Sequence, residues 1–578
     1  MPVTSRAGIF FHYNCAMDGK LKVVLCWHMH QPCYRDPLSD EYVLPWTYLH
    51  AIKDYVDMAA HLEACPAARV VVNFTPTLLE QLTDYERQIA AYLGGGTAIR
   101  DPLLAALGAS GYGGQDEDRI DILRACLRAH EQNQIQRHPA YARLVGIARG
   151  AVAAPGVCAY LSDQFFADLL VWYHLAWLGE SVRRSDARAQ ALVQQGQHYT
   201  RSQRLEFLAG IGELIRSIVP RYRRLMESGQ VELSVTPYAH PIAPLLIDRT
   251  VTREAMPEVA LPQAPQYPDG EARARWHVQE SIRVFESYFG RRPAGCWPAE
   301  GGVSARTLEV LGEAGFAWVA SGQGVLGNSA RRFQALAPPQ RPYRVHDAGP
   351  ACFFRDDGLS DLIGFQYAKW HADDAVANLA GHLHNIRRTC NDASRSVVAI
   401  ILDGENAWDY YPANGWYFLS ALYRRLAQDP HLDMNTFSDC LASGMPVETL
   451  PGLVAGSWIY GTFSTWIGEL DKNRAWDLLD AAKLAVDRHL ASAPVGDGER
   501  RAIERQLAIC EGSDWFWWFG PHHARDTVAE FDGLFRRHLL ALYRMMGIAP
   551  PPDLDVPMAQ GREQGPTQSS MLPAKGQA

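Results

Sequence analysis

The sequence lacks a long apolar segment, an excess of basic residues and regularly spaced cysteines. No stretch offers the roughly 18 uncharged apolar residues of a membrane-spanning helix, so we predict no contact with a bilayer. A net charge of -9 and a pI of about 6.1 argue against a nucleic-acid partner, since phosphate binding requires clustered Lys and Arg. The 11 cysteines form no CxxC pair, which argues against a disulfide framework and a structural zinc site and favours the reducing cytoplasm.

The composition is that of a globular protein with room for a large core. The chain has 578 residues, of which 47% are hydrophobic and 21% charged, enough for two or three domains or for one enlarged barrel with an appendage. We expect residues 1–20 to be a loose N-terminal extension. We expect residues 550–578, which are rich in Pro, Gly, Gln and Ser, to be disordered because they have little apolar surface to bury.

Short apolar runs separated by helical patterns predict an α/β fold. The runs are typical of strands buried on both faces, and they occupy residues 22–27, 69–74, 231–236, 295–297, 316–320, 362–366 and 397–402. Between about 100 and 225 amphipathic patterns dominate and strand signals disappear, which predicts a helical insertion. Beyond 412 the pattern is again helical. The alternation indicates a parallel barrel or an open doubly wound sheet.

Ionisable residues follow nearly every predicted strand, which favours the barrel because its site is assembled from several strand ends. His28 and His30 share one face where the first strand ends. The pattern fits either a structural role or a ligand-binding role for the two side chains. Asp403 and Glu405 flank Gly404 directly after the last apolar run. The alternative for that segment is an ordinary Asp-Gly turn followed by a helix start.

Two carboxylates facing each other across the barrel mouth would support glycoside hydrolysis, and Glu300 is the natural partner of Asp403. A separation of about 5 to 5.5 Å would give retention of configuration and one of about 6.5 to 9.5 Å inversion. The sequence leaves that separation open. Four tryptophans lie near the proposed acids or in aromatic segments, where they would serve as sugar platforms or as core residues: Trp297, Trp408, Trp458 and Trp466.

Five segments resemble the motif regions of glycoside hydrolase family 57 and occur in that family's order. They are HMHQP at 28–32, VELSVTPYAHP at 231–241, CWPAEGGVS at 296–304, LDGENAW at 402–408 and FSTWIGELDKNRAW at 463–476. The resemblance implies a (β/α)7 barrel, here residues 21–412 including the insertion, followed by an all-helical C-terminal domain, here residues 413–549, that contributes aromatic residues to the cleft. It also implies action on α-glucans with retention of configuration.

The resemblance further implies roles for individual residues. Glu300 would be the nucleophile and Asp403 the acid/base, and a first group would bind the sugar near the scissile bond: His28, His30, His240 and Trp297. Trp408, Trp458 and Trp466 would lie close by, and Glu405 would bind substrate or orient Asp403. No cofactor or metal is expected. The form DGENAW is most similar to the amylase and amylopullulanase members, whereas the family also includes 4-α-glucanotransferases and branching enzymes.

Two other functions fit part of the pattern. The first is a metal-dependent deacetylase or mannosidase-like hydrolase, with His28, His30 and Asp403 as zinc ligands. The second is a glycan-binding protein that has lost turnover. The absence of an HxD or HxxxH set argues against the former, and the presence of both Glu300 and Asp403 argues against the latter.

Overall fold

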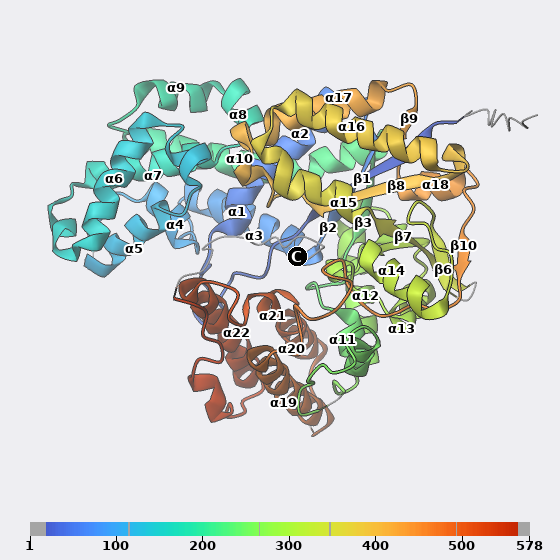
Figure 1. The fold of residues 1–578 in the computed structure, drawn as a ribbon. Helices are drawn as coiled ribbons and strands as arrows, with labels where there is room; N and C mark the ends of the chain where they lie inside the picture. Colours follow the sequence, from blue (N-terminus) through green and yellow to red (C-terminus); the bar gives the residue numbers. More distant parts are fainter. Residues whose placement is uncertain (1–18, 114–115, 265, 346–347, 493, 564–578) are drawn as a thin grey trace, which may run out of the picture.

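A computed structural model describes residues 19–113, 116–264, 266–345, 348–492 and 494–563. Most of the predicted N-terminal extension and the last part of the predicted disordered tail lie outside the described residues. The remainder forms one body with a strand barrel, a helical insertion and a helical C-terminal region (Figure 1).

Seven parallel strands close into a barrel, as the sequence predicted. They are β1 (Leu21–Met29), β2 (Val70–Phe74), β3 (Val231–Val235), β4 (Gly295–Cys296), β5 (Trp318–Gly322), β7 (Ala348–Arg355) and β8 (Val397–Asp403). Each strand pairs with the next, and β8 pairs with β1, which closes the ring. Apolar side chains fill the barrel, since β2 and β5 are buried along their whole length. Because the seven strands are parallel, their carboxyl ends meet at one rim of the barrel.

One predicted strand is wrong. Residues Leu362–Gln366 form a π-helical turn, η6, and the strand at that place in the barrel is β7, residues Ala348–Arg355. A five-residue apolar run looks the same whether it is a buried strand or one buried helical turn. Gly349 and Pro350 interrupt the apolar pattern of β7, which hid the real strand.

Helices connect the barrel strands and cover its outside. The crossover from β1 to β2 consists of α1 (Trp46–His50), the π-helical turn η1 (Ala51–Tyr55) and α2 (Val56–Ala64). The remaining covering helices are α3 (Pro76–Leu93), α11 (Ala243–Ile247), α12 (Gly270–Phe289), α13 (Ala305–Glu313), α14 (Gln323–Phe333), α15 (Asp357–Asp361) and α16 (Ala372–Thr389).

The segment between α3 and β3 is helical throughout, as expected from about residue 100 to 225, and it extends to the left of the barrel in Figure 1. Its elements are α4 (Pro102–Gly108), α5 (Asp116–Cys126), η2 (Glu131–Ile135), α6 (Pro139–Ala153), η3 (Pro155–Tyr160), α7 (Asp163–Trp177), α8 (Glu180–Ser185), α9 (Ala187–Gln195) and α10 (Arg201–Glu227). The last and longest of these helices packs back on α3 and leads into the barrel again.

The C-terminal helices form the lower part of the molecule in Figure 1. They are α19 (Leu470–Ser492), α20 (Asp497–Cys510), α21 (Asp514–Trp518) and α22 (Arg525–Met545). Several elements that follow the expected domain boundary at 412 still contact the barrel and its covering helices. After it, α17 (Trp416–Gln428) packs on α16, β9 (Leu432–Met434) pairs with β1, and α18 (Phe437–Ala442) leads to β10 (Glu448–Leu450), which pairs with β6 (Tyr343–Val345). In sequence, a helix that covers a barrel is indistinguishable from the first helix of a new domain.

The segment after α22 also differs from the expectation of disorder. Residues 552–555 form a 3-10 turn, and Leu554, Met558 and Ala559 are buried. Average composition predicted disorder here, whereas a few apolar side chains at suitable spacing are enough to hold a short segment against a helix. Residues 564–578 lie outside the described residues.

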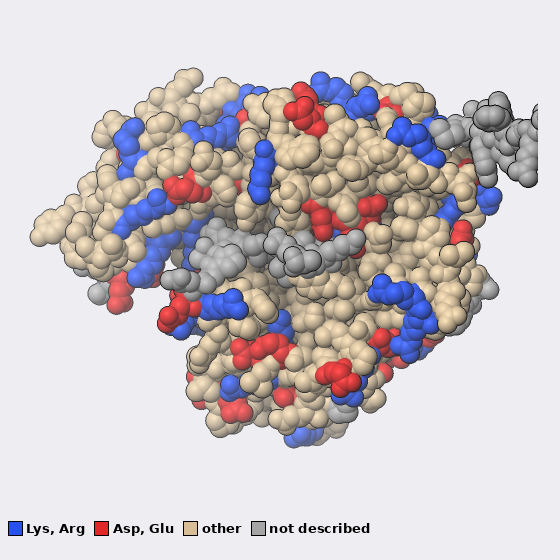
Figure 2. Space-filling model, viewed as in Figure 1, with Lys and Arg blue, Asp and Glu red and all other residues tan. Residues whose placement is uncertain are grey.

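The molecular surface has mixed charge on the face shown in Figure 2, where Lys and Arg alternate with Asp and Glu. Within the described part of the chain, no helix is both long enough and apolar enough to cross a membrane.

Candidate active site

A cavity of about 400 Å³ lies at the carboxyl ends of the barrel strands. Its lining includes side chains at the last positions of β1, β7 and β8 and in the loops after β1, β4 and β8. They are His28, His30, Glu300, Arg355, Asp403 and Glu405. The helical insertion forms one wall with residues 128–130, Gln134 and Trp177, and α21 and α22 form another with Asp514, Trp517 and Trp518 among others. Three parts of the chain that are remote in sequence therefore enclose one space.

Asp403 enters the cavity because β8 ends there in a tight turn. The N–H of Gly404 donates to the carbonyl of His28 at 2.7 Å, and a side chain at position 404 would collide with Met29. Asn406 Nδ2 donates to Asp403 Oδ2 at 3.0 Å. Burial raises the pKa of Asp403, while Asn406, His30 and Arg355 favour its ionised form. The turn proposed as the alternative for this segment is thus present, and it delivers the carboxylate.

Glu300 is held in a strained conformation directly after β4. Its backbone is left-handed, with φ 57° and ψ 23°, which is uncommon for a residue with a side chain. Trp458 holds both the backbone and the side chain of Glu300. Its N–H donates to the Glu300 carbonyl at 3.0 Å, and its Nε1 donates to Glu300 Oε2 at 2.8 Å. Burial, followed by repulsion from Asp403, raises the pKa of Glu300 to about 8.

Burial raises the pKa of both Glu300 and Asp403, and the charge of Asp403 further disfavours ionisation of Glu300. In the substrate-free protein Glu300 is mainly protonated at neutral pH, because burial and the neighbouring carboxylate raise its pKa to about 8. One ionised and one protonated carboxyl group in the same cavity is the combination that acid/base and nucleophilic chemistry requires.

His28 and His240 belong to a buried chain of hydrogen bonds. His28 Nδ1 lies 2.7 Å from Asn73 Oδ1 and its Nε2 lies 3.1 Å from His240 Nε2, while His240 Nδ1 lies 2.8 Å from Ser513 Oγ. Burial lowers the pKa of His28 to about 3 and that of His240 well below its usual value. Both rings are therefore neutral, and the network fixes their orientation. His28 lines the cavity, whereas His240 stands behind it.

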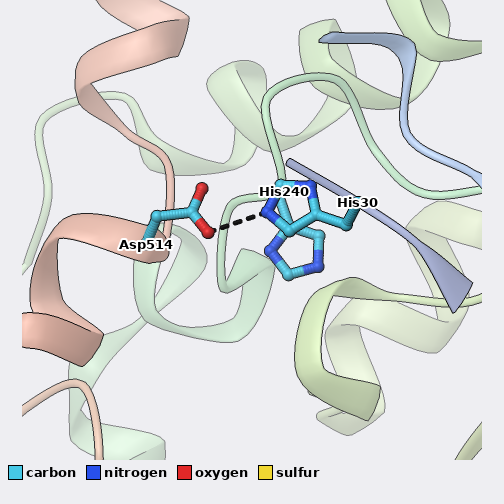
Figure 3. Close-up of side chains that lie close together, drawn as sticks. All are labelled: His30, His240 and Asp514. Carbon is cyan, nitrogen blue, oxygen red and sulfur yellow. Dashed lines mark hydrogen bonds and ion pairs between the residues drawn. The ribbon is translucent and has the colours of Figure 1, made fainter. Parts of the chain in front are cut away.

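His30 links the barrel to the C-terminal helices. Its Nε2 lies 2.7 Å from Asp514 Oδ1 of α21, and its Nδ1 lies 3.2 Å from Thr75 Oγ1. The His30 ring stacks on the ring of His240, with centroids 3.8 Å apart and planes inclined by 14° (Figure 3).

These contacts argue against a metal site. His30, His240 and Asp514 offer donor atoms within 4.8 Å of one another. Nitrogen lone pairs lie in the ring plane, so two stacked parallel imidazoles do not aim at one ion. The set expected for zinc, His28, His30 and Asp403, fits no better because every imidazole nitrogen in it already has a protein partner.

Glu405 is buried beneath the loop that follows β1. Its Oε1 accepts from His30 N–H at 3.1 Å, from Gln31 Nε2 at 3.3 Å and from Tyr55 O–H at 3.3 Å, whereas its buried Oε2 has no hydrogen-bond partner. Burial raises the pKa of Glu405 well above its usual value. Glu405 holds the backbone of His30 in place and also lines the cavity.

Among the four tryptophans singled out from the sequence, only Trp458 lines the cavity. Trp297, Trp408 and Trp466 are buried within the protein and support the site from behind. Trp297 packs edge-on against Trp458, with centroids 5.2 Å apart, and Trp408 Nε1 donates to the Gly404 carbonyl at 2.8 Å. Trp408 thus holds the turn that presents Asp403.

Several lining residues escaped the sequence analysis. Arg355 was missed because its strand, β7, was missed; it lies 5.3 Å from the Trp458 ring, and its charge favours ionised Asp403. Asp514, Trp517 and Trp518 belong to the aromatic segment 511–519, whose composition was visible but whose position depends on the packing of α21. Trp46, His50 and Trp177 carried no motif that distinguishes them from core residues.

A parallel barrel whose rim presents two buried carboxyl groups beside tryptophan is an arrangement that can support glycoside hydrolysis. The model of glycosyl hydrolase family 57 matches residues 24–451, so the protein belongs to that family. No individually curated protein proved similar to the chain.

Solved structures share the fold at low sequence identity. A GH57-type branching enzyme from Pyrococcus horikoshii is 16% identical, with a TM-score of 0.53 over 96% of this chain and 99% of that one. The α-amylase AmyC from Thermotoga maritima is 14% identical, with a TM-score of 0.52 over 91% of this chain and 94% of that one. A 4-α-glucanotransferase from Thermococcus litoralis is 13% identical, with a TM-score of 0.50 over 91% of this chain and 60% of that one.

Proposed function

We propose that the protein cleaves or transfers α-linked glucan chains by a retaining double displacement, with Glu300 as nucleophile and Asp403 as acid/base. The observation that carries the proposal is the pair of buried carboxyl groups that line one cavity at the barrel rim, where Asp403 contributes to the raised pKa of Glu300. The names of the similar structures, a branching enzyme, an amylase and a glucanotransferase, favour an α-glucan as the substrate.

In the first step the Glu300 carboxylate attacks the anomeric carbon while the Asp403 carboxyl group protonates the glycosidic oxygen, so that the bond to the leaving chain breaks. In the second step the Asp403 carboxylate accepts a proton from water or from a sugar hydroxyl, whose oxygen displaces Glu300. Water yields hydrolysis and a sugar yields transfer. Both outcomes use the same two residues.

This division of roles requires an ionised Glu300 and a protonated Asp403 during reaction, although Glu300 is mainly protonated in the substrate-free protein. A glycosidic oxygen placed next to Asp403 accepts a hydrogen bond from the protonated form and so favours it. The N–H of Trp458 favours ionised Glu300. Substrate binding therefore favours the protonation states that the chemistry needs.

The proposal is tested with Glu300→Gln and Asp403→Asn on maltoheptaose and on a maltooligosaccharide aryl glycoside with a good leaving group. We expect each variant to lose at least about 10²-fold in kcat on maltoheptaose. Asp403→Asn should keep its first step on the aryl glycoside, which needs no acid, whereas Glu300→Gln should lose activity on both. Exposed Glu313→Gln serves as the control.

Three results would overturn the assignment: activity within about tenfold of wild type in either folded variant, the reverse pattern on the aryl glycoside, or a first product of inverted configuration by NMR. The products also distinguish the reactions. Shorter chains alone indicate hydrolysis, longer chains indicate transfer, and new branch points on a branched glucan indicate branching.

A further inference from the structure

The two walls of the cavity meet in one ion pair. Arg128, in the loop between α5 and η2, contacts Glu530 of α22, with Arg128 Nη1 3.4 Å from Oε2 and Nη2 in closer contact with Oε1. Both side chains line the cavity. Among the described residues, no other ion pair or hydrogen bond that the structure shows joins residues 102–227 to residues 470–545.

Each wall is attached to the barrel independently of this pair. On the insertion side, Asn133 Nδ2 donates to the carbonyl of Asp409 at 2.8 Å, and the rings of His130 and Tyr410 stand 5.4 Å apart. The Arg128 carbonyl accepts from the hydroxyl of Tyr173 at 3.3 Å, which fixes the loop itself. Without the ion pair the insertion therefore remains attached to the barrel, while the contact between its tip and α22 is lost.

On the C-terminal side, α22 lies against the loop that follows β1. Arg537 pairs with the buried carboxylate of Asp36, and the rings of Phe531 and Tyr34 pack edge to face with centroids 6.4 Å apart. The barrel, the insertion, the ion pair and α22 thus form a closed ring of contacts around the cavity. The two residues that close this ring line the same cavity as Glu300 and Asp403.

We propose that Arg128 and Glu530 form a latch that determines which parts of a glucan reach the carboxylate pair. With the latch closed, a chain enters by threading its end. With the latch open, the insertion and α22 separate at their tips and admit a chain interior or a branch point. This inference rests on the proposed function and adds to it the selection between chain ends and interiors.

The energetics suit a latch. The side chains of Arg128 and Glu530 are 34% and 30% exposed, and ion pairs this accessible to water contribute little to stability and weaken with salt. Opening the latch therefore costs little, and a change in either charge shifts the balance between the closed and the open form.

The test compares two substrates of the same linkage. Maltoheptaose has ends that can thread, whereas a large-ring cyclic α-1,4-glucan has none and reaches the carboxylates only through an open latch. The measured quantity is the ratio of kcat/KM on the cyclic glucan to kcat/KM on maltoheptaose. We expect Arg128→Gln and Glu530→Gln each to raise this ratio about two- to fivefold, the range that an exposed ion pair can account for.

Two matched variants control the comparison. Glu313→Gln removes an exposed ion pair with Arg275 on the barrel surface and should leave the ratio unchanged. The charge-exchanged protein Arg128→Glu/Glu530→Arg rebuilds the pair and should return the ratio toward that of wild type. In the wild-type protein alone, the ratio should rise with ionic strength, and this rise should be absent from Glu530→Gln.

The latch would be refuted if Arg128→Gln and Glu530→Gln both had the same ratio as the wild-type protein. It would also be refuted if the wild-type ratio did not change with ionic strength. The same holds if Glu313→Gln raises the ratio equally. Failure of the proposed function has a different signature, because the wild-type protein would then turn over neither substrate.

Discussion

At the scale of single residues, the conformation and burial of Glu300 cost the folded protein stability. Its backbone is left-handed, its carboxyl group is largely removed from water, and a second carboxylate stands nearby. Groups arranged in this way destabilise the folded protein, and they persist because the surrounding structure determines their positions. Trp458, which bonds to both the carbonyl and the side chain of Glu300, supplies that constraint.

This cost predicts a pH-dependent gain in stability for Glu300→Gln. The pKa of Glu300 rises from 4.5 to about 8 on folding. The folded protein therefore binds more protons than the unfolded chain between these pH values, and the contribution of Glu300 to the free energy of unfolding falls as pH rises through this window and levels above it.

We expect Glu300→Gln to lack this fall and to exceed wild type by on the order of 2 kcal/mol above pH about 8, since contact with cavity water reduces the full effect. Urea denaturation at several pH values measures the difference, with Glu313→Gln as the exposed control. A difference between Glu300→Gln and wild type that stays constant from pH 4.5 to 8 would contradict the account.

At the scale of elements, the position of Trp458 depends on how tightly its segment packs on the end of β5. A Cβ added at Gly322 would lie 2.5 Å from the Trp458 Cα, which is backbone and cannot move aside cheaply. Residues 303 and 456 also form a bridge that ties the segment of Trp458 to the loop of Glu300. The site therefore depends on this contact between two loops.

Gly322→Ala should consequently push Trp458 away from Glu300. We expect a loss of about 1–3 kcal/mol in stability, as for overpacking elsewhere, together with a lower kcat. Gly327→Ala, on α14 with no atom within 4 Å of the new Cβ, is the matched control and should be neutral or slightly stabilising. Thermal denaturation and kinetics on maltoheptaose measure both effects. A Gly322→Ala protein as stable and active as wild type would show that the packing is looser than described.

At the scale of the whole molecule, buried ion pairs attach the C-terminal helices to the barrel. Arg249 begins the 3-10 helix η4 (Arg249–Glu254), which follows α11. It is fully buried and makes two hydrogen bonds, of 2.8 and 2.6 Å, to Asp480 of α19. The guanidinium also lies 4.5 Å from the ring of Trp476. Since α21 and α22 form a wall of the cavity, this attachment supports the site as well as the fold.

Asp480→Ala would leave the guanidinium of Arg249 buried without a counter-charge, and we expect a loss of about 3–5 kcal/mol in stability. Asp121→Ala removes the partner of Arg124 in an ion pair whose two side chains are 58% and 71% exposed, and it should change stability by less than about 0.5 kcal/mol. Equilibrium unfolding followed by tryptophan fluorescence measures both. Equal losses in the two variants would show that the Arg249 pair does not hold the regions together.

The sequence by itself indicated an α/β fold, because runs such as 397–402 are apolar and short enough for buried strands, and polar strand ends favoured a barrel. It also singled out Glu300 and Asp403 as candidates, because ionisable residues shortly after such runs are expected at the barrel rim. Motif order then indicated the family, which the match over residues 24–451 confirmed. Only the tertiary structure decided which side chains share the cavity. Trp458 reaches it and Trp466 does not, and Arg128 meets Glu530 across 402 positions of sequence. Local pattern reports whether a side chain is apolar or charged, whereas packing between distant segments decides which side chains face the same space.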